Sequence, residues 1–130
     1  MMNINTAMKL SAKGMTAERF RMDTISSNIA NANSVRTNGQ DPYRRHIVSL
    51  KATEDGVQIA GIEEDQSELR KVYEPGNPNG DTEGYVYYSN VDPLREMVDM
   101  MSASRAYEAN ISAFNSAKSM VKAALNIGKV

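Results

Sequence analysis

The chain is 130 residues long, 41% hydrophobic and 24% charged, which is the composition of an ordinary globular domain rather than of a disordered chain. Its net charge of −1 argues against nucleic-acid binding, because phosphate recognition draws on clustered lysines and arginines. It holds no cysteine, so disulfides, thiolate metal sites and thiol catalysis are excluded. No apolar run approaches the roughly 20 residues of a membrane span, and Asn3, Asn5 and Lys9 interrupt any apolar stretch of a secretory signal.

Residues 5–32 form the first predicted helix. Its apolar residues recur every seven positions, with one more four residues before the last of them, so that they share one helical stripe. These residues are Met8, Met15, Met22, Ile25 and Ile29. Gly14 interrupts the segment at a cost of about 1 kcal/mol relative to alanine. The stripe predicts that this helix packs against a partner along most of its length.

The clearest predicted helix begins after Asp92, which can cap its first turn, with Pro93 at the first helical position. Gly128 is a plausible end. Such a helix has roughly 35 residues and is about 50 Å long, which exceeds what a small chain covers by itself.

Side chains of this second helix step alternately by three and four residues, a spacing typical of a coiled-coil seam. They are Met97, Met100, Ser104, Tyr107, Ile111, Phe114, Lys118, Val121 and Leu125. Small residues suit a close approach of another helix to the opposite face, namely Ala103, Ala106, Ala109, Ala113, Ala117 and Ala124. The two helices therefore predict an antiparallel hairpin, and each helix is also expected to present a second face to other chains.

Short β-prone runs separated by turn residues lie between the helices, at residues 45–52, 57–62, 69–73 and 85–88. They predict a small antiparallel sheet or a pair of hairpins, which needs something to pack on. Residues 31–42 have no apolar period and are expected to form an extended connector.

The predicted fold class is thus α+β, mainly α, with long terminal helices pairing as a coiled coil around a small β-rich insert. Residues 1–33 and 92–130 are expected to form one domain, which residues 34–91 interrupt.

Residues suited to catalysis are scarce. His46 is the only histidine, and a lone histidine at the start of a strand is far more often an edge residue than a catalytic base. The acidic run from Glu63 to Asp65 lacks the glycine-centred spacing of a calcium loop. The sequence therefore predicts no enzyme, no cofactor, no metal site and no small-molecule substrate.

Several motifs resemble those of one known family. The segment from Ser27 to Ser34 reads SNIANANS and looks like the S-N-I-A-N-A-N-T motif of the rod and hook proteins that form the axis of the bacterial flagellum. Pro42 to Arg45 resembles a narrower pattern within that family, that of a proximal rod protein. Further similar segments follow in the expected order: Tyr73–Pro78, Glu83–Val86, Ser89–Asp92, Glu96–Met101 and Ser104–Asn110.

This resemblance implies a structural subunit of the flagellar basal-body rod, which assembles through its terminal helices into a hollow shaft that transmits torque. The implied partners are copies of the same chain, other rod proteins and the flagellar type III export apparatus, with export to the cell envelope and no cleaved signal peptide. The expected assembly interface comprises Met8, Met15, Met22, Ile25, Ile29, Met97, Met100, Tyr107, Ile111, Phe114, Val121 and Leu125.

The asparagine motif has an expected role of its own. It comprises Asn28, Ile29, Ala30, Asn31, Ala32 and Asn33. Because asparagine tolerates turn conformations and bonds to nearby backbone groups, its three asparagines are expected to satisfy backbone groups where the first helix ends.

Three alternatives remain. Another rod paralogue shares the motifs, whereas a hook protein carries a much larger central domain. A cytoplasmic coiled-coil adaptor explains the seam but not the ordered motifs. An enzyme with its site between subunits is least favoured, because the chain offers neither nucleophile nor base.

Overall fold

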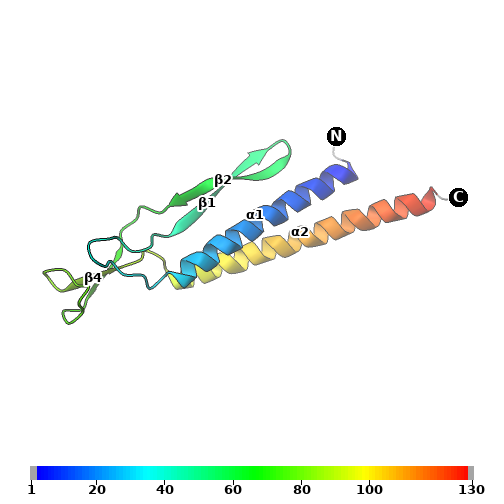
Figure 1. Cartoon of the computed structure of the whole chain (residues 1–130). Coiled ribbons are helices and arrows are strands. Elements are labelled where there is room, and N and C mark those ends of the chain that lie inside the picture. Colours follow the sequence, from blue (N-terminus) through cyan, green and yellow to red (C-terminus); the bar gives the residue numbers. More distant parts are fainter. Residues whose placement is uncertain (1–2, 129–130) are drawn as a thin grey trace.

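The computed structural model describes residues 3–128 and shows an elongated molecule built on two long antiparallel helices (Figure 1). Its elements in chain order are α1 (Ile4–Ala30), β1 (His46–Thr53), β2 (Gly56–Glu64), β3 (Arg70–Tyr73), β4 (Tyr85–Tyr88) and α2 (Pro93–Ile127). The β1–β2 hairpin runs along α1, and the β3–β4 hairpin lies beyond one end of the helix pair. We call that end, where α1 ends and α2 begins, the head, and the opposite end the tail.

Local capping explains where the helices begin and end. The side chain of Asn3 accepts a hydrogen bond from the backbone N–H of Thr6 at 2.8 Å, and Asp92 accepts one from Leu94 at 3.1 Å. Pro93 occupies the first turn of α2, and Gly128 is its C-terminal cap. The predicted bounds are therefore confirmed to within two residues at each end.

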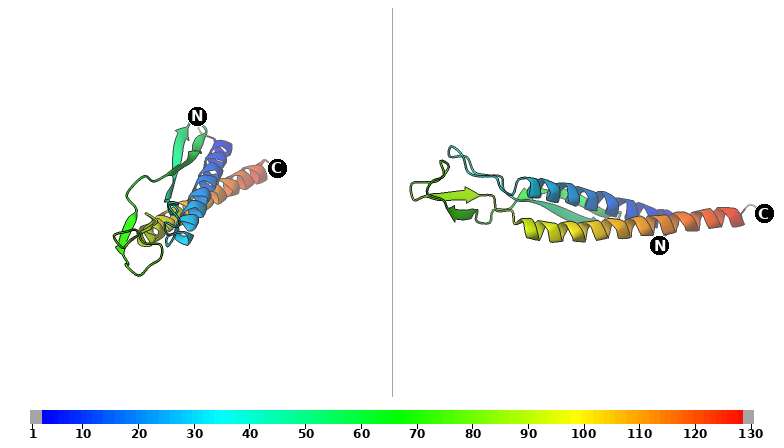
Figure 2. Two further views of the ribbon diagram at one scale, coloured as in Figure 1. Left: turned by 60° about the vertical axis from the view of Figure 1, so that its left-hand side comes forward. Right: turned by 90° about the horizontal axis from the view of Figure 1, so that it is seen from below.

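Two contacts fix the register of the helix pair. Asn28 bonds to Glu96 at the head, and Gly14 lies against Asn110, so closely that an added Cβ would come within 2.6 Å of the Asn110 Oδ1 atom. Asn28 and Gly14 are 14 residues apart, and so are Asn110 and Glu96, as an antiparallel pair requires. Ten residues from Gly14 toward the start of α1, and ten residues from Asn110 toward the end of α2, Ile4 lies level with Met120. The end of α2 therefore extends past the start of α1 (Figure 2).

The close contact at Gly14 also explains a glycine that weakened the helix prediction. Any other residue there would displace the Asn110 amide, which bonds to the backbone oxygen of Ala106 at 2.9 Å. Glycine is unfavourable inside a helix, but its lack of a side chain is what allows the two helices to approach closely here.

The face of α2 that meets α1 holds two rows of residues. One row, Met100, Tyr107, Phe114 and Val121, is half-buried and was predicted. The other row consists of Glu96, Ala103, Asn110 and Ala117, three of which are buried. It lies one residue before the second predicted row, which was Met97, Ser104, Ile111 and Lys118. The expectation that Ala103 and Ala117 face away from the seam was wrong, because small side chains are what allow the helices to approach closely here.

The β1–β2 hairpin is antiparallel and pairs His46 with Glu64 at its open end and Thr53 with Gly56 at its turn. A register shift between Ser49 and Leu50 bends it along the helix. Gly56 sits against Leu10 of α1 in a left-handed conformation with φ of 114°, so the hairpin turn lies toward the tail.

The β3–β4 hairpin is a separate two-stranded sheet with Arg70 opposite Tyr88. The connector lies along β4, where the Arg36 N–H donates to the Tyr87 oxygen at 2.9 Å. The Arg36 guanidinium also stacks on the Tyr87 ring, 4.3 Å from its centroid. Val86 is completely buried at the centre of this hairpin.

The predicted fold class is confirmed: the protein is mainly α, with packed terminal helices and small β-hairpins between them. Neither helix, over the residues that the structure describes, is both long and apolar enough to cross a membrane.

Candidate functional site

A cluster of polar side chains at the head joins the end of α1, the start of β1, the end of β2 and the start of α2. We call it the head junction and define it as Asn28, Tyr43, Arg45, His46, Asp65, Asn90, Glu96 and Asp99. Its two central side chains, Asn28 and Glu96, are each only 1% exposed. Burial of this kind is costly for polar groups unless every hydrogen bond is made, so the partners decide what the cluster does.

Asn28 uses its full hydrogen-bonding capacity. Its Nδ2 donates to the backbone oxygen of His46 at 2.9 Å and to the Glu96 Oε2 atom at 3.1 Å. Its Oδ1 accepts from the backbone N–H of His46 at 2.9 Å and from the Tyr43 hydroxyl at 2.8 Å. A primary amide can donate two hydrogen bonds and accept two, and the Asn28 side chain makes all four of them. Asn28 thus acts as a strand partner for the first residue of β1 and fixes the hairpin to the helices.

Tyr43 and His46 complete this arrangement. Since Tyr43 donates its only proton to Asn28, its oxygen accepts from the His46 Nδ1 atom, which lies 2.6 Å away. The Nδ1 atom of His46 therefore carries a proton. The two rings also pack together at a centroid distance of 4.8 Å. His46 thus has a structural role at the edge of the hairpin.

Arg45 neutralises the buried Glu96. Its Nε atom donates to the Glu96 Oε1 atom, and its Nη atoms lie 3.4 Å from an Asp65 oxygen and 3.6 Å from an Asp99 oxygen. Burial by itself would lower the pKa of Arg45, but the hydrogen bonds and negative charges of Glu96 and Asp65 outweigh it and raise that pKa above its ordinary value. The guanidinium therefore stays charged and ties β1 to the start of α2.

Asn90 and Asp65 hold the other side of Arg45. The Arg45 backbone N–H donates to the Asn90 Oδ1 atom at 2.7 Å, and the Asn90 Nδ2 atom donates to the Asp65 backbone oxygen at 2.9 Å. A hydrogen bond from the backbone N–H of Ser67 and the nearby Arg45 charge lower the pKa of Asp65. The end of β2 is thereby joined to the segment before α2.

Chemically, this junction suits a structural role. Every buried side-chain nitrogen and oxygen within residues 3–128 has a hydrogen-bond partner, so the cost of burying these polar groups is offset within the chain. Within the same range, no group of three or more acidic or histidine side chains has the geometry to hold a metal ion. The junction instead locks four segments into one arrangement.

The other residues of the asparagine motif divide between core and surface. Ala32 is buried and Ile29 half-buried, whereas Ala30 and Asn33 are exposed. The Asn31 side chain donates to the Ser27 backbone oxygen at 2.8 Å and its N–H caps the end of α1. Asn31 thus satisfies a backbone group where α1 ends, as expected, whereas Asn28 bonds from within the helix to the backbone of His46 on a distant strand.

The predicted interface residues occupy three kinds of position. Most are buried or half-buried along the helix pair, namely Met8, Met15, Met22, Ile25, Ile29, Met100, Tyr107, Ile111, Phe114 and Val121. Met97 is 51% exposed near the head, and Leu125 is 63% exposed at the tail. Leu125 shares the inner side of α2 with the seam but lies beyond the start of α1, so it has no helix to pack on within residues 3–128.

Two exposed apolar surfaces remain on α2. The head stripe consists of Leu94, Met97, Val98 and Met101, which recur at helical spacing on the side away from α1 and are 51–71% exposed. The tail tip is the overhanging segment 120–127, where Met120, Leu125 and Ile127 are 60–76% exposed. The head stripe is contiguous on one side of the helix, whereas in the tail tip Leu125 lies on the side opposite Met120 and Ile127. Exposed apolar residues that are contiguous mark interaction surfaces.

The sequence reasoning missed the head junction and the head stripe. One signal was available for Glu96: it precedes Ala103, Asn110 and Ala117 at intervals of seven and so shares their row. A buried carboxylate at such a position requires a cationic partner. Arg45 supplies it, and this residue belongs to the segment Pro42 to Arg45, which had been considered only for its resemblance to the rod proteins.

Comparisons with known proteins agree with this architecture at both ends of the chain. Residues 8–36 match the family model described as "Flagella basal body rod protein", and residues 82–127 match "Flagellar basal body rod FlgEFG protein C-terminal". The first match covers most of α1 with its asparagine motif, and the second covers β4 and α2.

Curated relatives match nearly end to end. The flagellar basal-body rod protein FlgC of Bacillus subtilis is 42% identical over 145 aligned residues, which cover 95% of this chain and 97% of that protein. FlgC of Borreliella burgdorferi is 40% identical, with 97% and 98% covered, and FlgC of Salmonella typhimurium is 40% identical, with 92% and 94% covered.

Proposed function

The chain belongs to the FlgC family of flagellar basal-body rod proteins, and we propose that it enters the rod by packing the outward faces of its terminal helices against neighbouring subunits. As a member of this family it is a structural rod subunit and not an enzyme. Its partners in this proposal are copies of itself and other rod proteins, and the assembled subunits form a hollow shaft that transmits torque.

The head stripe is the observation that carries this proposal. Four large apolar side chains on one side of α2 are left in water, on the face opposite the inner seam. Fully burying one such side chain contributes roughly 1.5–3 kcal/mol, so a neighbouring subunit that covers the stripe stabilises the assembly. A repeated contact of this heterologous kind generates a helical array.

The inner seam supports assembly indirectly. Residues 1–33 and 92–130 act as one tube-forming domain, and the insert 34–91 adds contacts outside it. Met8, Met15, Met22, Met100 and Phe114 hold the two helices together, so that the outward residues of α2 are presented in fixed positions.

Export through the flagellar type III apparatus, without cleavage of a signal peptide, forms part of the same proposal. Within residues 3–128 the buried side chains are few, and most of them are alanine, serine or valine, so unfolding for passage through a narrow channel is expected to be easy. The absence of cysteine also means that no disulfide has to be opened or reformed.

The proposal is tested by Met97→Asp, with Met97→Leu as the matched control. Because Met97 is half exposed and lies outside the inner seam, the free energy of unfolding of the purified chain is expected to change by less than about 0.5 kcal/mol. Incorporation into detergent-resistant basal bodies, measured by quantitative mass spectrometry, is expected to be lost for the aspartate variant only. Normal incorporation of that variant would remove the head stripe from the interface, and absence of the wild-type chain from basal bodies would contradict the proposal as a whole.

A further inference from the structure

Two features of the molecule are explained neither by the family membership nor by the head junction: the overhanging tail tip of α2, and an apolar groove near the middle of α1. We call the second feature the hairpin groove. It has a volume of about 320 Å³ and lies between α1 and β2. Its apolar lining comes from Ala12, Ala17, Val57 and Ile59, and Lys13 and Thr16 also line it.

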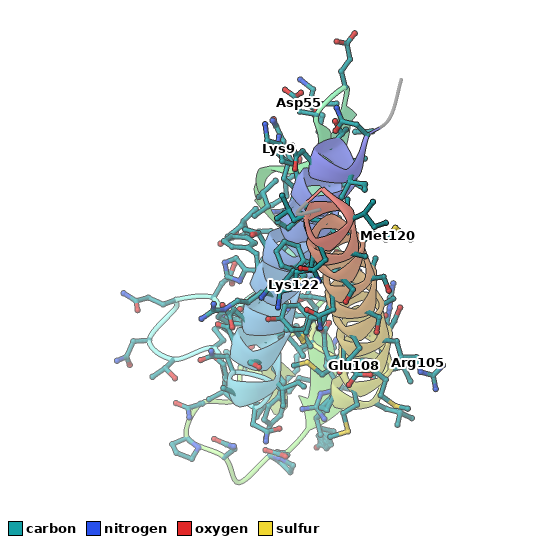
Figure 3. All side chains as sticks on the ribbon, turned by 90° about the vertical axis from the view of Figure 1, so that its right-hand side faces the viewer. Lys9, Asp55, Arg105, Glu108, Met120 and Lys122 are labelled. Carbon is teal, nitrogen blue, oxygen red and sulfur yellow. The ribbon has the colours of Figure 1, made fainter. Side chains whose placement is uncertain are left out.

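The tail tip and the surroundings of the hairpin groove carry opposite charges. From residue 109 to residue 128 the chain has two lysines, Lys118 and Lys122, and no acidic residue. The hairpin turn next to the groove carries Glu54 and Asp55, and neither forms an ion pair within the part of the chain that the structure describes. Figure 3 shows the molecule from the tail, with Asp55 on the hairpin turn and Met120 and Lys122 on the end of α2.

We propose that the hairpin groove of one subunit receives the tail tip of a second copy of the same chain. This contact would bury Leu125 against the apolar lining and bring Lys122, three residues earlier on the same side of the helix, close to Asp55. It rests on the proposed function, because it takes the subunits to be neighbours in one assembly, and it deepens that function by naming both partners of one contact.

Lys13 fits this arrangement as well. The last turn of α2 contains no basic residue, and the free carbonyl groups at the end of a helix carry a partial negative charge. A lysine lining the groove meets that end of the helix favourably. In this contact the apolar tail tip meets the apolar lining of the groove, Lys122 meets the acidic hairpin turn, and the C-terminus of α2 meets Lys13.

The geometry makes the contact intermolecular. The groove is level with Gly14 and hence with Asn110 of α2, whereas the middle of the tail tip is about 14 residues further along the helix, or about 20 Å at 1.5 Å per residue. No tip reaches the groove of its own chain. A neighbour displaced by about 20 Å along the helix axis brings its tip level with the groove.

The contact is also directional, since a tip meets a groove rather than another tip. Such a heterologous contact propagates from copy to copy instead of closing a two-fold dimer. It thus contributes to growth along the axis, whereas the head stripe contributes side-by-side packing.

A cysteine cross-link tests the contact in the full-length chain, which has no cysteine of its own. The double variant Leu125→Cys/Thr16→Cys places one thiol on the tip and one at the groove. Within one chain these positions are about 25 Å apart along the axis, far beyond the roughly 7 Å between Cα atoms that a disulfide spans. Oxidation of the concentrated protein and of basal bodies is expected to give a ladder of covalent dimers, trimers and longer chains on a denaturing gel.

Matched variants separate the outcomes. Ser112→Cys/Thr16→Cys, with its first thiol on the exposed surface of α2, is expected to give no ladder, and adding Lys122→Glu to the Leu125→Cys/Thr16→Cys variant is expected to reduce the yield several-fold. Restoration of that yield by Asp55→Lys would support the assigned charge pair. Dimers from Leu125→Cys alone would overturn the inference in favour of tip-to-tip pairing. Normal incorporation into basal bodies without any ladder would overturn it while leaving the proposed function intact, and failure of the wild-type chain to incorporate would defeat both.

Discussion

The two ends of the helix pair are held in opposite ways. At the head, polar side chains from four segments complete one another, and Asn28 and Glu96 are buried with all their hydrogen bonds made. At the tail, α2 runs past α1 with Leu125 and Ile127 in water. The polar head junction is completed within one chain, whereas in our proposal the tail tip is covered only by a neighbour. The proposal thus predicts a subunit whose head junction is ordered before assembly and whose tail becomes ordered on assembly.

The largest effect is expected from removing the cation of the head junction. Arg45→Ala leaves Glu96 buried without its charged partner, which should lower the free energy of unfolding by about 3–5 kcal/mol. Urea denaturation followed by circular dichroism measures the loss. The double variant Arg45→Met/Glu96→Leu removes both charges and is expected to lose much less. Equal losses in the two variants would show that packing, rather than the unpaired charge, holds the head.

Asn28→Ala should give the second largest loss. It strands the backbone N–H and oxygen of His46 and a buried oxygen of Glu96, for which a decrease of about 2–3 kcal/mol is expected. Asn31→Ala is the control, because its side chain is exposed and makes one hydrogen bond to Ser27, so about 1 kcal/mol or less is expected. If both asparagines cost the same in urea denaturation, the special position of Asn28 is refuted.

A double-mutant cycle tests the close contact between Gly14 and Asn110 in the middle of the helix pair. In Asn110→Ala, changing Gly14 to alanine should stabilise the chain by about 1 kcal/mol, the usual propensity gain in a helix. In the wild-type background the same change also displaces the Asn110 amide, so the gain should vanish or reverse. Identical gains in the two backgrounds would mean that Gly14 and Asn110 are not coupled.

The smallest effect is expected on the loss of stability at acidic pH. A hydrogen bond from the Ser67 backbone, together with the Arg45 charge, holds the pKa of Asp65 below its ordinary value of 3.8. Because the folded-state pKa is the lower one, the stabilisation by the carboxylate is complete above about pH 4 and is lost as the pH falls through the folded-state value. Asp65→Asn should therefore show a weaker decrease of stability between pH 5 and pH 3, of roughly the size of one surface ion pair. An unchanged acid profile would exclude Asp65 from the junction's energetics.

The sequence predicts most of the fold because helix ends and turns carry local signals. Asp92, Pro93 and Gly128 define α2 without reference to the rest of the chain, and the turn residues separate four strands that were placed to within two residues. One seam row was misplaced by one residue, because the pattern followed large apolar side chains while the close approach uses Ala103 and Ala117.

The head junction was beyond the reach of local patterns. Asn28 and Glu96 are 68 residues apart in sequence, and neither residue type by itself indicates burial. Only the packed helix pair brings them together with Arg45. The tail was equally hidden, since its overhang follows from the register that Gly14 and Asn110 set.

Hydrogen exchange measured by mass spectrometry, on the dilute chain and on purified basal bodies, tests the contrast between head and tail most directly. In the dilute chain, amides at the start of α2, around residues 96–110, are expected to exchange slowly, whereas those of residues 118–127 exchange as fast as an open helix end. In basal bodies the tail amides should become as protected as those of the head. Slow exchange at the tail of the dilute, monomeric chain, or fast exchange there within the assembled rod, would contradict the account that assembly completes the tail.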